Sequence, residues 1–225
     1  YQIQTKFRNE ERAKNGILRG REFLMKDLYS FSRNEEELND FYDKAKSAYL
    51  RVFERTGLKD RTFITFAGGG AFSKWSHEFQ TLSEAGEDTI YLCREKGVAV
   101  NKEAFSDEVL RELGLERSEL SEEKSIETGN IFKLGTRFSE PLGLYYTDES
   151  GRKMPVVMGS YGIGLSRLMG AIAEVLSDDK GLIWPKETAP FQIHLLSLSK
   201  GGVKGEDSAE IEAEKLYKKL SDKDI

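Results

Sequence analysis

Hydrophobic and polar residues alternate in two runs near the start of the chain. The alternation covers residues 1–10 and returns over residues 19–27, which predicts two β-strands. The polar stretch between them ends in Asn15-Gly16, a dipeptide typical of a tight turn. The pattern therefore predicts a β-hairpin. One of its faces carries arginine, carboxylate and aromatic side chains together.

A different period follows the hairpin. Hydrophobic residues recur at helical spacing over residues 38–53. Ser32 or Asn34 can cap this helix, and Gly57 can end it. We further expect strands over residues 61–66, 89–92 and 126–136, and a hairpin over residues 144–158. Residues 102–125 are charged and helix-prone, and a second amphipathic helix is expected after Gly164.

The last stretch has a pattern of its own. Residues 191–197 read as a strand and residues 208–220 as a helix. A strand followed by a helix suits the start of an α/β unit.

Composition narrows the class of protein. The chain has 225 residues, of which 38% are hydrophobic and 32% charged, and its formal net charge is −5. This charge argues against non-specific coating of nucleic acid. Cys93 is the single cysteine, so an internal disulfide and a cysteine zinc cluster are excluded. There is no apolar run of membrane-spanning length and no secretory signal, so we expect a cytoplasmic protein without a membrane anchor. Both ends look cut, and we expect a fragment.

The residue types on the predicted hairpin suit a nucleotide. A guanidinium group offers a fork of donors to phosphate or carboxylate. An aromatic ring offers a stacking surface, and a carboxylate can accept a hydrogen bond from an exocyclic amine. The alternative is a solvated hairpin with weak surface ion pairs.

A second candidate motif is Gly159 to Arg167, which follows a strand-like run and opens a helix. It lacks the third glycine of a dinucleotide-binding fingerprint. The glycine cluster at residues 68–70 has no lysine at P-loop spacing, so we expect a flexible loop near the site.

These motifs together resemble a known family. Residues 6–10 and 21–27, Lys-Phe-Arg-Asn-Glu and Arg-Glu-Phe-Leu-Met-Lys-Asp, resemble motif 2 of class II aminoacyl-tRNA synthetases in its prolyl-tRNA synthetase form. Gly162-x-Gly164-x-x-Arg167 resembles motif 3. Residues 76–79, Ser-His-Glu-Phe, are similar to a segment that the family carries before its insertion point. Asn130 stands where the family usually has histidine, and asparagine cannot carry charge.

The resemblance implies an α+β fold, with an antiparallel β-sheet flanked by helices. It implies a catalytic core over residues 1–187, without motif 1, and the beginning of an α/β anticodon-binding domain over residues 188–225. Many bacterial members insert a large editing domain where this chain has residues 94–125. About thirty residues cannot house such a domain, so we expect a short helical replacement.

The implied activity is ATP-dependent formation of prolyl-adenylate and transfer of proline to tRNA(Pro). ATP with Mg²⁺ would be required, and a homodimer is expected. Many bacterial relatives have Cys-x-x-Cys where this chain has Cys93 and Lys96, so no zinc is expected. The alternatives are a ligase of the same subclass for threonine, serine or glycine, and a non-catalytic, synthetase-like tRNA-binding module.

The resemblance also assigns residues, position by position. Arg8 and Arg167 would be catalytic. The ATP-binding residues would be Arg8, Glu10, Arg19, Phe23, Glu127, Thr128 and Arg167. The proline-binding residues would be Met25, Asp27, His77, Asn130 and Ser160. Glu78 and Glu127 are the candidate Mg²⁺ ligands.

Overall fold

The computed structural model describes residues 1–11, 13, 15–198 and 209–223. The chain divides into two compact units, Tyr1–Ile183 and Trp184–Ile225.

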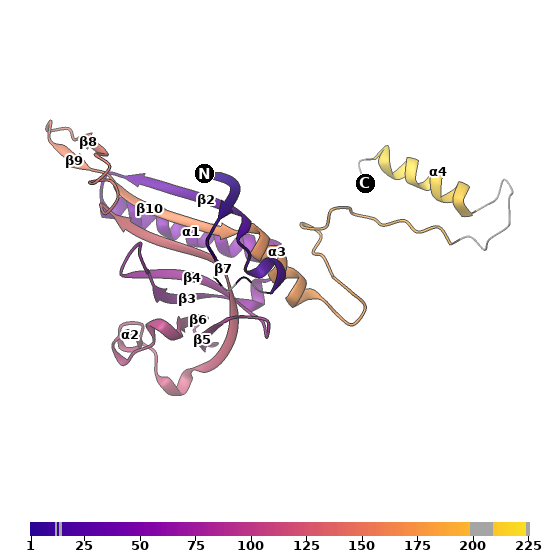
Figure 1. Ribbon diagram of the computed structural model, residues 1–225, viewed down its shortest axis with the longest axis horizontal. Helices are drawn as coiled ribbons and strands as arrows, with labels where there is room; N and C mark the ends of the chain where they lie inside the picture. Colours follow the sequence, from indigo (N-terminus) through magenta and orange to yellow (C-terminus); the bar gives the residue numbers. More distant parts are fainter. Residues whose placement is uncertain (12, 14, 199–208, 224–225) are drawn as a thin grey trace. The chain divides into compact units, whose positions relative to one another are not determined.

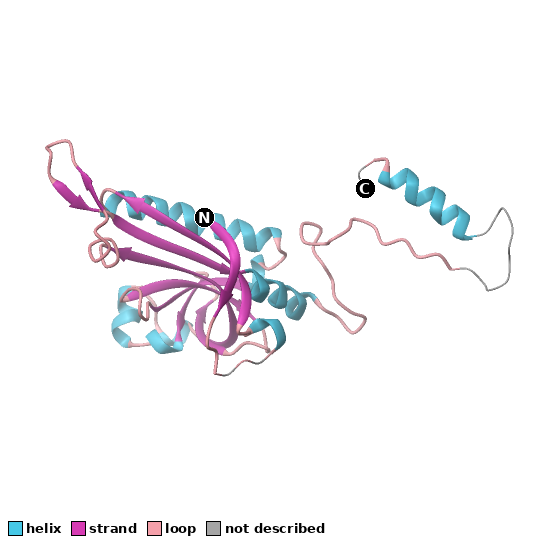
Figure 2. Ribbon diagram, turned by 45° about the horizontal axis from the view of Figure 1, so that its top comes forward, coloured by secondary structure: helices cyan, strands magenta, loops and turns pink. Residues whose placement is uncertain are grey.

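An eight-stranded sheet forms the centre of the first unit, with strand order β1-β2-β10-β7-β4-β3-β6-β5 (Figures 1 and 2). Its strands are β1 (Gln2–Phe7), β2 (Glu22–Ser32), β3 (Thr62–Gly68), β4 (Trp75–Leu82), β5 (Asp88–Cys93), β6 (Val98–Asn101), β7 (Ser121–Gly135) and β10 (Val157–Gly164). Every neighbouring pair is antiparallel except β3 and β6. A small hairpin, β8 (Tyr145–Thr147) and β9 (Lys153–Pro155), projects from one end. The expected α+β fold with an antiparallel sheet is confirmed.

Helix α1 (Glu35–Arg55) covers one face of the sheet. Asn34 caps it, because its side chain accepts a hydrogen bond from the Glu37 amide. The buried stripe of the helix is Leu38, Tyr42, Ala45, Tyr49 and Phe53. The face that α1 covers is therefore closed, and the opposite face is left for a site.

Residues on β2 show the two faces directly. Lys26 points toward α1, where its ammonium group lies 2.6 Å from the Tyr49 hydroxyl. Burial lowers the pKa of Lys26 to about 8. Phe23, Met25 and Asp27 alternate with it and face the other way, as the period of two predicts.

The segment at residues 102–125 differs in part from its prediction. It forms short helices, η3 (Lys102–Ala104), α2 (Asp107–Glu112) and η4 (Arg117–Glu119), around a small hydrophobic core that includes Cys93, Val109 and Leu110. The predicted helical run to residue 125 is wrong at its end, because β7 begins at Ser121. Residues 121–125 pair with β5, and this sheet pairing overrides their helical propensity.

Helix α3 (Leu165–Leu176) follows β10 directly and carries Arg167 in its first turn. It packs against the 3₁₀ turn η1 (Gly16–Leu18) of the loop between β1 and β2. Two segments almost 150 residues apart in sequence thus lie beside each other at one end of the sheet.

The second unit contains helix α4 (Ala209–Ser221). The predicted strand over residues 191–197 is wrong, since none of residues 184–198 belongs to a strand. Phe191, Leu196 and Leu198 in this segment are exposed, so no strand among the described residues covers them. The predicted helix start at Ser208 lies outside the described residues.

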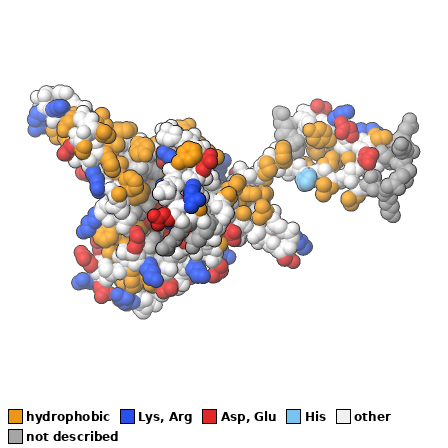
Figure 3. Space-filling model, viewed as in Figure 1, with side chains coloured by type: hydrophobic (Ala, Val, Ile, Leu, Met, Phe, Trp, Pro, Cys, Tyr) orange, Lys and Arg blue, Asp and Glu red, His pale blue; other side chains and the backbone are white. Residues whose placement is uncertain are grey.

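Acidic and basic side chains are interspersed over the first unit on the face seen in Figure 3. Among the helices in the described part of the chain, none is both long and apolar enough to cross a membrane.

Candidate nucleotide and amino-acid site

A row of residues crosses four strands on the face opposite α1. Asp27 on β2 pairs with Gly162 on β10, Gly162 with Asn130 on β7, and Asn130 with Glu78 on β4. Gly162 lets the Met25 side chain lie over the middle of this row, because a Cβ at position 162 would be only 2.7 Å from the Met25 Cε. The row is the floor of the site.

An irregularity in β7 brings a second carboxylate onto the same face. Opposite β4, Gly129 pairs with Phe79 but Glu127 pairs with Gln80, so Thr128 is an extra residue in the ladder. Such a bulge shifts the alternation by one residue. Glu127 and Asn130, an odd number of positions apart, therefore both face the site.

The side chain of the bulged residue, Thr128, forms its hydrogen bonds within the sheet. The Thr128 hydroxyl donates to the Phe79 carbonyl at 2.9 Å and lies 3.1 Å from the Thr81 hydroxyl. Its side chain is buried. Although Thr128 lines the first cavity described below, its hydroxyl is already occupied.

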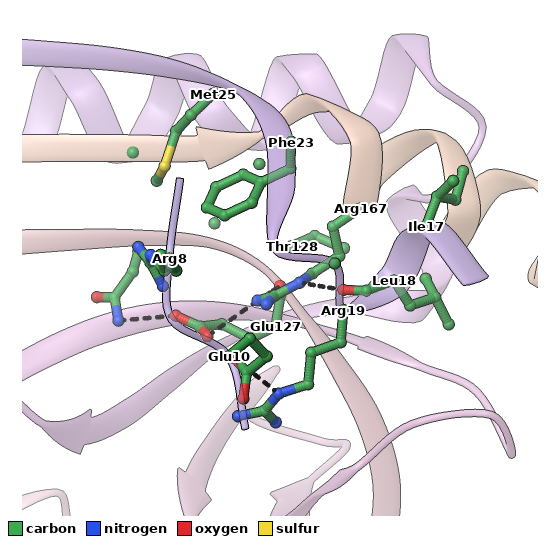
Figure 4. Close-up of a pocket in the computed structure, with 15 residues that line it drawn as sticks. Arg8, Glu10, Ile17, Leu18, Arg19, Phe23, Met25, Glu127, Thr128 and Arg167 are labelled. Atoms are coloured by element: carbon green, nitrogen blue, oxygen red, sulfur yellow. Dashed lines mark hydrogen bonds and ion pairs between the residues drawn. The ribbon is translucent and has the colours of Figure 1, made fainter. Parts of the chain in front are cut away.

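The first cavity lies where the hairpin, β7 and the start of α3 meet (Figure 4). Its lining includes every residue expected to bind ATP. The lining residues are Arg8, Glu10, Ile17, Leu18, Arg19, Gly20, Phe23, Met25, Glu127, Thr128, Gly129, Asn130, Gly162, Gly164 and Arg167.

Arg167 joins three parts of this cavity. Its Nε donates to the Leu18 carbonyl at 2.9 Å, and its Nη1 donates to the Glu127 carbonyl at 2.9 Å and lies 3.2 Å from Glu127 Oε2. Burial among the strands raises the pKa of Glu127, and the guanidinium group of Arg167 opposes that rise. The planar group is therefore held between Leu18 and Glu127 at the edge of the cavity (Figure 4).

Arg8 connects the first cavity to a second one. Its guanidinium carbon lies 5.2 Å from the centre of the Phe23 ring, within cation–π distance. Arg8 lines both cavities, as do Met25, Glu127 and Asn130. A ligand atom in either cavity can therefore reach the same guanidinium group.

The second cavity has a volume of about 520 Å³, within the usual range for small-molecule sites. Asp27 and Ser160 line it, with an aromatic wall at Phe72 and Phe132. Asp27 is 7% exposed, and its Oδ2 forms an ion pair of 2.6 Å with the Lys6 ammonium group. An anionic residue beside an apolar wall suits a small ligand that has both an ammonium group and an aliphatic part.

A network of amides and carboxylates joins Glu127 and Asn130, which line both cavities, to Glu78. Glu78 accepts hydrogen bonds from Gln80 and Asn101 at 2.8 and 2.9 Å, and Asn130 donates to Glu127 at 3.0 Å and to Glu78 at 3.4 Å. Burial, followed by the nearby Glu127 carboxylate, raises the pKa of Glu78 to about 8.

The carboxylates of Glu78 and Glu127 share Asn130 as a hydrogen-bond donor and lie near the arginines of the first cavity. This pair fits a divalent cation that takes its remaining ligands from phosphates and water. Among the described residues, no three His, Cys, Asp or Glu side chains gather as a metal site. These residues therefore do not suit a metal ion that is held by protein side chains alone. Glu78 and Glu127 fit Mg²⁺ only as the protein's share of a mixed ligand set.

His77 is the one predicted site residue that lies elsewhere. It neighbours Glu78 on β4, so its side chain points to the opposite face of the sheet. There its Nδ1 lies 2.8 Å from the Tyr42 hydroxyl of α1, and its ring packs against Phe66. The prediction that His77 binds proline is corrected: it is part of the packing between α1 and the sheet.

The position of His77 gives a pH-dependent stability. Burial lowers its pKa from 6.5 to about 4, so the unfolded chain takes up a proton first as the pH falls. Stability present above about pH 6.5 should be lost as the pH falls toward about 4. Between about pH 7.5 and 5 we expect the wild type to lose about 2 kcal/mol more than His77→Phe.

Urea denaturation of both proteins at the two pH values measures this difference. The variant keeps a ring against Phe66, and Tyr42 keeps its hydrogen bond to the Ile131 carbonyl. Both proteins have the same carboxylates, so the contribution of the carboxylates to the pH dependence cancels in the comparison. Equal pH dependence in both would contradict the assignment.

Sequence reasoning missed two residues that contact the predicted set. Lys6 pairs with Asp27, and Glu87 contacts Arg19 at 2.6 Å. The alternation of β1 does place Lys6 on the same face as Phe23, its register partner. Glu87 carried no such signal, since it belongs to a turn whose place beside the hairpin depends on the folded sheet.

Comparison with known proteins adds independent information. Residues 1–176 match the family model described as the tRNA synthetase class II core domain (G, H, P, S and T). The chain is 41% identical over 241 residues to the proline–tRNA ligase of Rickettsia akari and 39% identical over 240 residues to that of Sulfurimonas denitrificans. These alignments cover 100% and 98% of this chain, but 55% and 54% of the relatives. The chain thus spans about half the length of the relatives it matches.

A solved structure gives a matching fold. The prolyl-tRNA synthetase of Cryptosporidium parvum, complexed with L-proline and AMP, superposes with a TM-score of 0.67 at 19% identity. The match covers 97% of this chain and 38% of that protein. At this identity the likeness concerns the fold alone.

Proposed function

The chain belongs to the family of class II tRNA synthetase core domains, and from that membership we propose that it is the proline-activating part of a proline–tRNA ligase. The reaction would join proline and ATP into prolyl-adenylate, with release of pyrophosphate, and then transfer the prolyl group to tRNA(Pro). The relatives named above at 41% and 39% identity favour proline over the other amino acids of the family.

The observation that carries the proposal is the position of Arg8 between the two cavities. In adenylation a carboxylate attacks the α-phosphorus, so two anions must come together. A guanidinium group shared by both cavities can hold the two anions and stabilise the charge that develops between them. Arg8 is therefore the residue we assign to the reacting centre.

The first cavity would hold ATP. Phe23 and Arg167 would stack on the two faces of adenine, and the Glu10 side chain would accept from its amine. Arg19 would meet the outer phosphates. Because the Thr128 hydroxyl is occupied within the sheet, its share in binding ATP would come from its backbone. Bound Mg²⁺ would neutralise phosphate charge, with Glu127 and Glu78 as its protein ligands.

The second cavity would hold proline. Asp27 would face the secondary ammonium group, Met25 would contact the ring, and Asn130 and Ser160 would supply polar contacts. Lys6, the present partner of Asp27, would give way to the substrate ammonium group. His77 has no place in this cavity, for the reason given above.

The remaining parts of the proposal concern the whole protein. Residues 1–187 would form the catalytic core, with residues 94–125 in place of an editing insertion. Residues 188–225 would begin the anticodon-binding domain. A homodimer working with tRNA(Pro) in the cytoplasm is what this role would require.

The test is amino-acid-dependent ATP–pyrophosphate exchange by the full-length protein. We expect exchange with proline to exceed exchange with threonine, serine or glycine by at least about a hundredfold, because those residues lack the ring and the secondary amine that the cavity is expected to read. Preference for another of these amino acids would change the substrate. No exchange with any amino acid, together with tRNA binding, would instead favour a non-catalytic module.

A further inference from the structure

The turn between β4 and β5 contacts the loop between β1 and β2. Both carboxylate oxygens of Glu87, at the end of this turn, engage the loop. Oε2 lies 2.6 Å from the Arg19 Nη1, and Oε1 accepts a hydrogen bond of 3.1 Å from the side-chain Nδ2 of Asn15. One side chain thus binds two residues of the loop that lines the nucleotide cavity.

The turn that carries Glu87 is fixed against β7. Gly86 lies directly against β7: a Cβ there would be 2.3 Å from the Ser125 carbonyl oxygen. The Ser83 amide donates to the Lys124 carbonyl at 3.2 Å, and the Gly86 amide donates to the Ser83 carbonyl at 3.0 Å. Glu87 is therefore held relative to β7, the strand that carries Glu127.

The loop is docked at a second point on the other side. Leu18 is 8% exposed and packs so closely on α3 that a Cβ at Gly170 would lie 2.6 Å from its Cδ2. Its carbonyl accepts from Arg167. Asn15 has a φ of 56°, a left-handed conformation that asparagine adopts more readily than most residues other than glycine. The bond to Glu87 holds the Asn15 side chain in this turn.

We propose that Glu87 is a positioning residue for nucleotide binding, which latches the loop at Asn15 and orients the Arg19 guanidinium group toward the outer phosphates. This rests on the proposed function. Glu87 lines the acidic cavity that adjoins the nucleotide cavity, together with Arg19 and Glu127. It is not a catalytic residue, since it acts through Arg19.

The alternative role is competition, in which the Glu87 carboxylate and the ATP phosphates would compete for the Arg19 guanidinium group. The geometry favours positioning. The Arg19 Nη1 lies 2.6 Å from Glu87, and its Nε lies 3.1 Å from Glu10 in an ion pair, whereas a guanidinium group has further N–H donors. Phosphate can therefore bind Arg19 while Glu87 still holds it. The two roles predict opposite changes in ATP affinity when the carboxylate is neutralised.

Glu87→Gln tests the latch, because it removes the charge while keeping the size and an acceptor. In ATP–pyrophosphate exchange by the full-length protein we expect KM for ATP to rise about 5- to 30-fold. The value of kcat and KM for proline should stay within about twofold. Asn15→Ala should raise KM for ATP by a smaller factor. Glu84→Gln is the matched control, because Glu84 lies on the same turn and its side chain is 97% exposed. This variant should leave kcat and both KM values unchanged.

Hydrogen–deuterium exchange of residues 15–21 without ATP gives a second readout that needs no activity. We expect faster exchange there in Glu87→Gln and unchanged exchange in β7. An unchanged or lowered KM for ATP would overturn the proposal, the latter in favour of competition. Equal changes in kcat and both KM values would show a merely structural role. A wild type without proline-dependent exchange would refute the proposed function, whereas the latch would still be read from hydrogen exchange.

Discussion

Replacing Arg167 with alanine is expected to lower proline-dependent ATP–pyrophosphate exchange by at least about a hundredfold. Loss of one well-oriented donor at a developing charge already costs about 10²–10³ in rate. Here the guanidinium group is also expected to stack on the adenine. Its removal further leaves the Glu127 carboxylate without the partner now 3.2 Å away. Exchange at saturating proline, with ATP varied, measures the loss.

Two further variants show which property of Arg167 matters. Arg167→Lys keeps the charge but loses the planar fork, so we expect a partial recovery relative to alanine. Arg51→Ala removes an exposed arginine from α1 and should leave exchange unchanged. Thermal unfolding of all three variants separates lost activity from lost structure. Near-normal exchange in a folded Arg167→Ala protein would refute the assignment to the nucleotide site.

Arg8→Ala is expected to have a comparably large effect with a different signature. Because Arg8 lines both cavities, its loss should raise KM for ATP and KM for proline as well as lower kcat, with an overall loss in kcat/KM of at least about a hundredfold. Glu87→Gln, in contrast, should affect KM for ATP alone. Steady-state exchange with each substrate varied in turn distinguishes the two patterns.

The controls for Arg8 follow from its geometry. Arg8→Lys keeps a cation but cannot present two parallel donors to two anions, so it should remain strongly impaired. Arg33→Ala removes a surface arginine whose side chain is 70% exposed and paired with Glu37, and it should behave as wild type. An Arg8→Ala protein in which only one KM changed would place Arg8 in one cavity and not at their junction.

Local periodicity was sufficient to predict the hairpin face. Phe23, Met25 and Asp27 are spaced by two along a strand, and the register of β1 and β2 pairs Phe23 with Lys6 on the same face. Capping at Asn34 and the helical spacing after it likewise predicted α1, because those signals act within a few residues of each other.

Alternation could not decide which of two neighbours faces the site. His77 and Glu78 must point to opposite faces of β4, but the sequence does not say which face α1 covers. That choice depends on the packing of Tyr42 and Tyr49 against the sheet, a tertiary effect. The same limit explains the β7 boundary, since residues 121–125 are strand only because β5 pairs with them.

Contacts between distant segments were the least accessible to sequence reasoning. Arg19 was expected at the phosphates from its motif, but its partner Glu87 lies 68 residues away. Glu87 lies in a run of acidic and small residues, 83–88, and no pattern in this run distinguishes it as a partner of Arg19. The fold brings the two together because the turn from β4 to β5 lies against β7 at Gly86.

The extra residue at Thr128 makes the length of β7, and not only its composition, a condition for function. Deleting this one residue would restore a regular ladder and turn either Glu127 or Asn130 toward α1. Many substitutions at this position would keep the count and hence the facing of both neighbours. Evolution can therefore change the identity of this residue more readily than it can remove it, so relatives that conserve the chemistry should align through this segment without a gap.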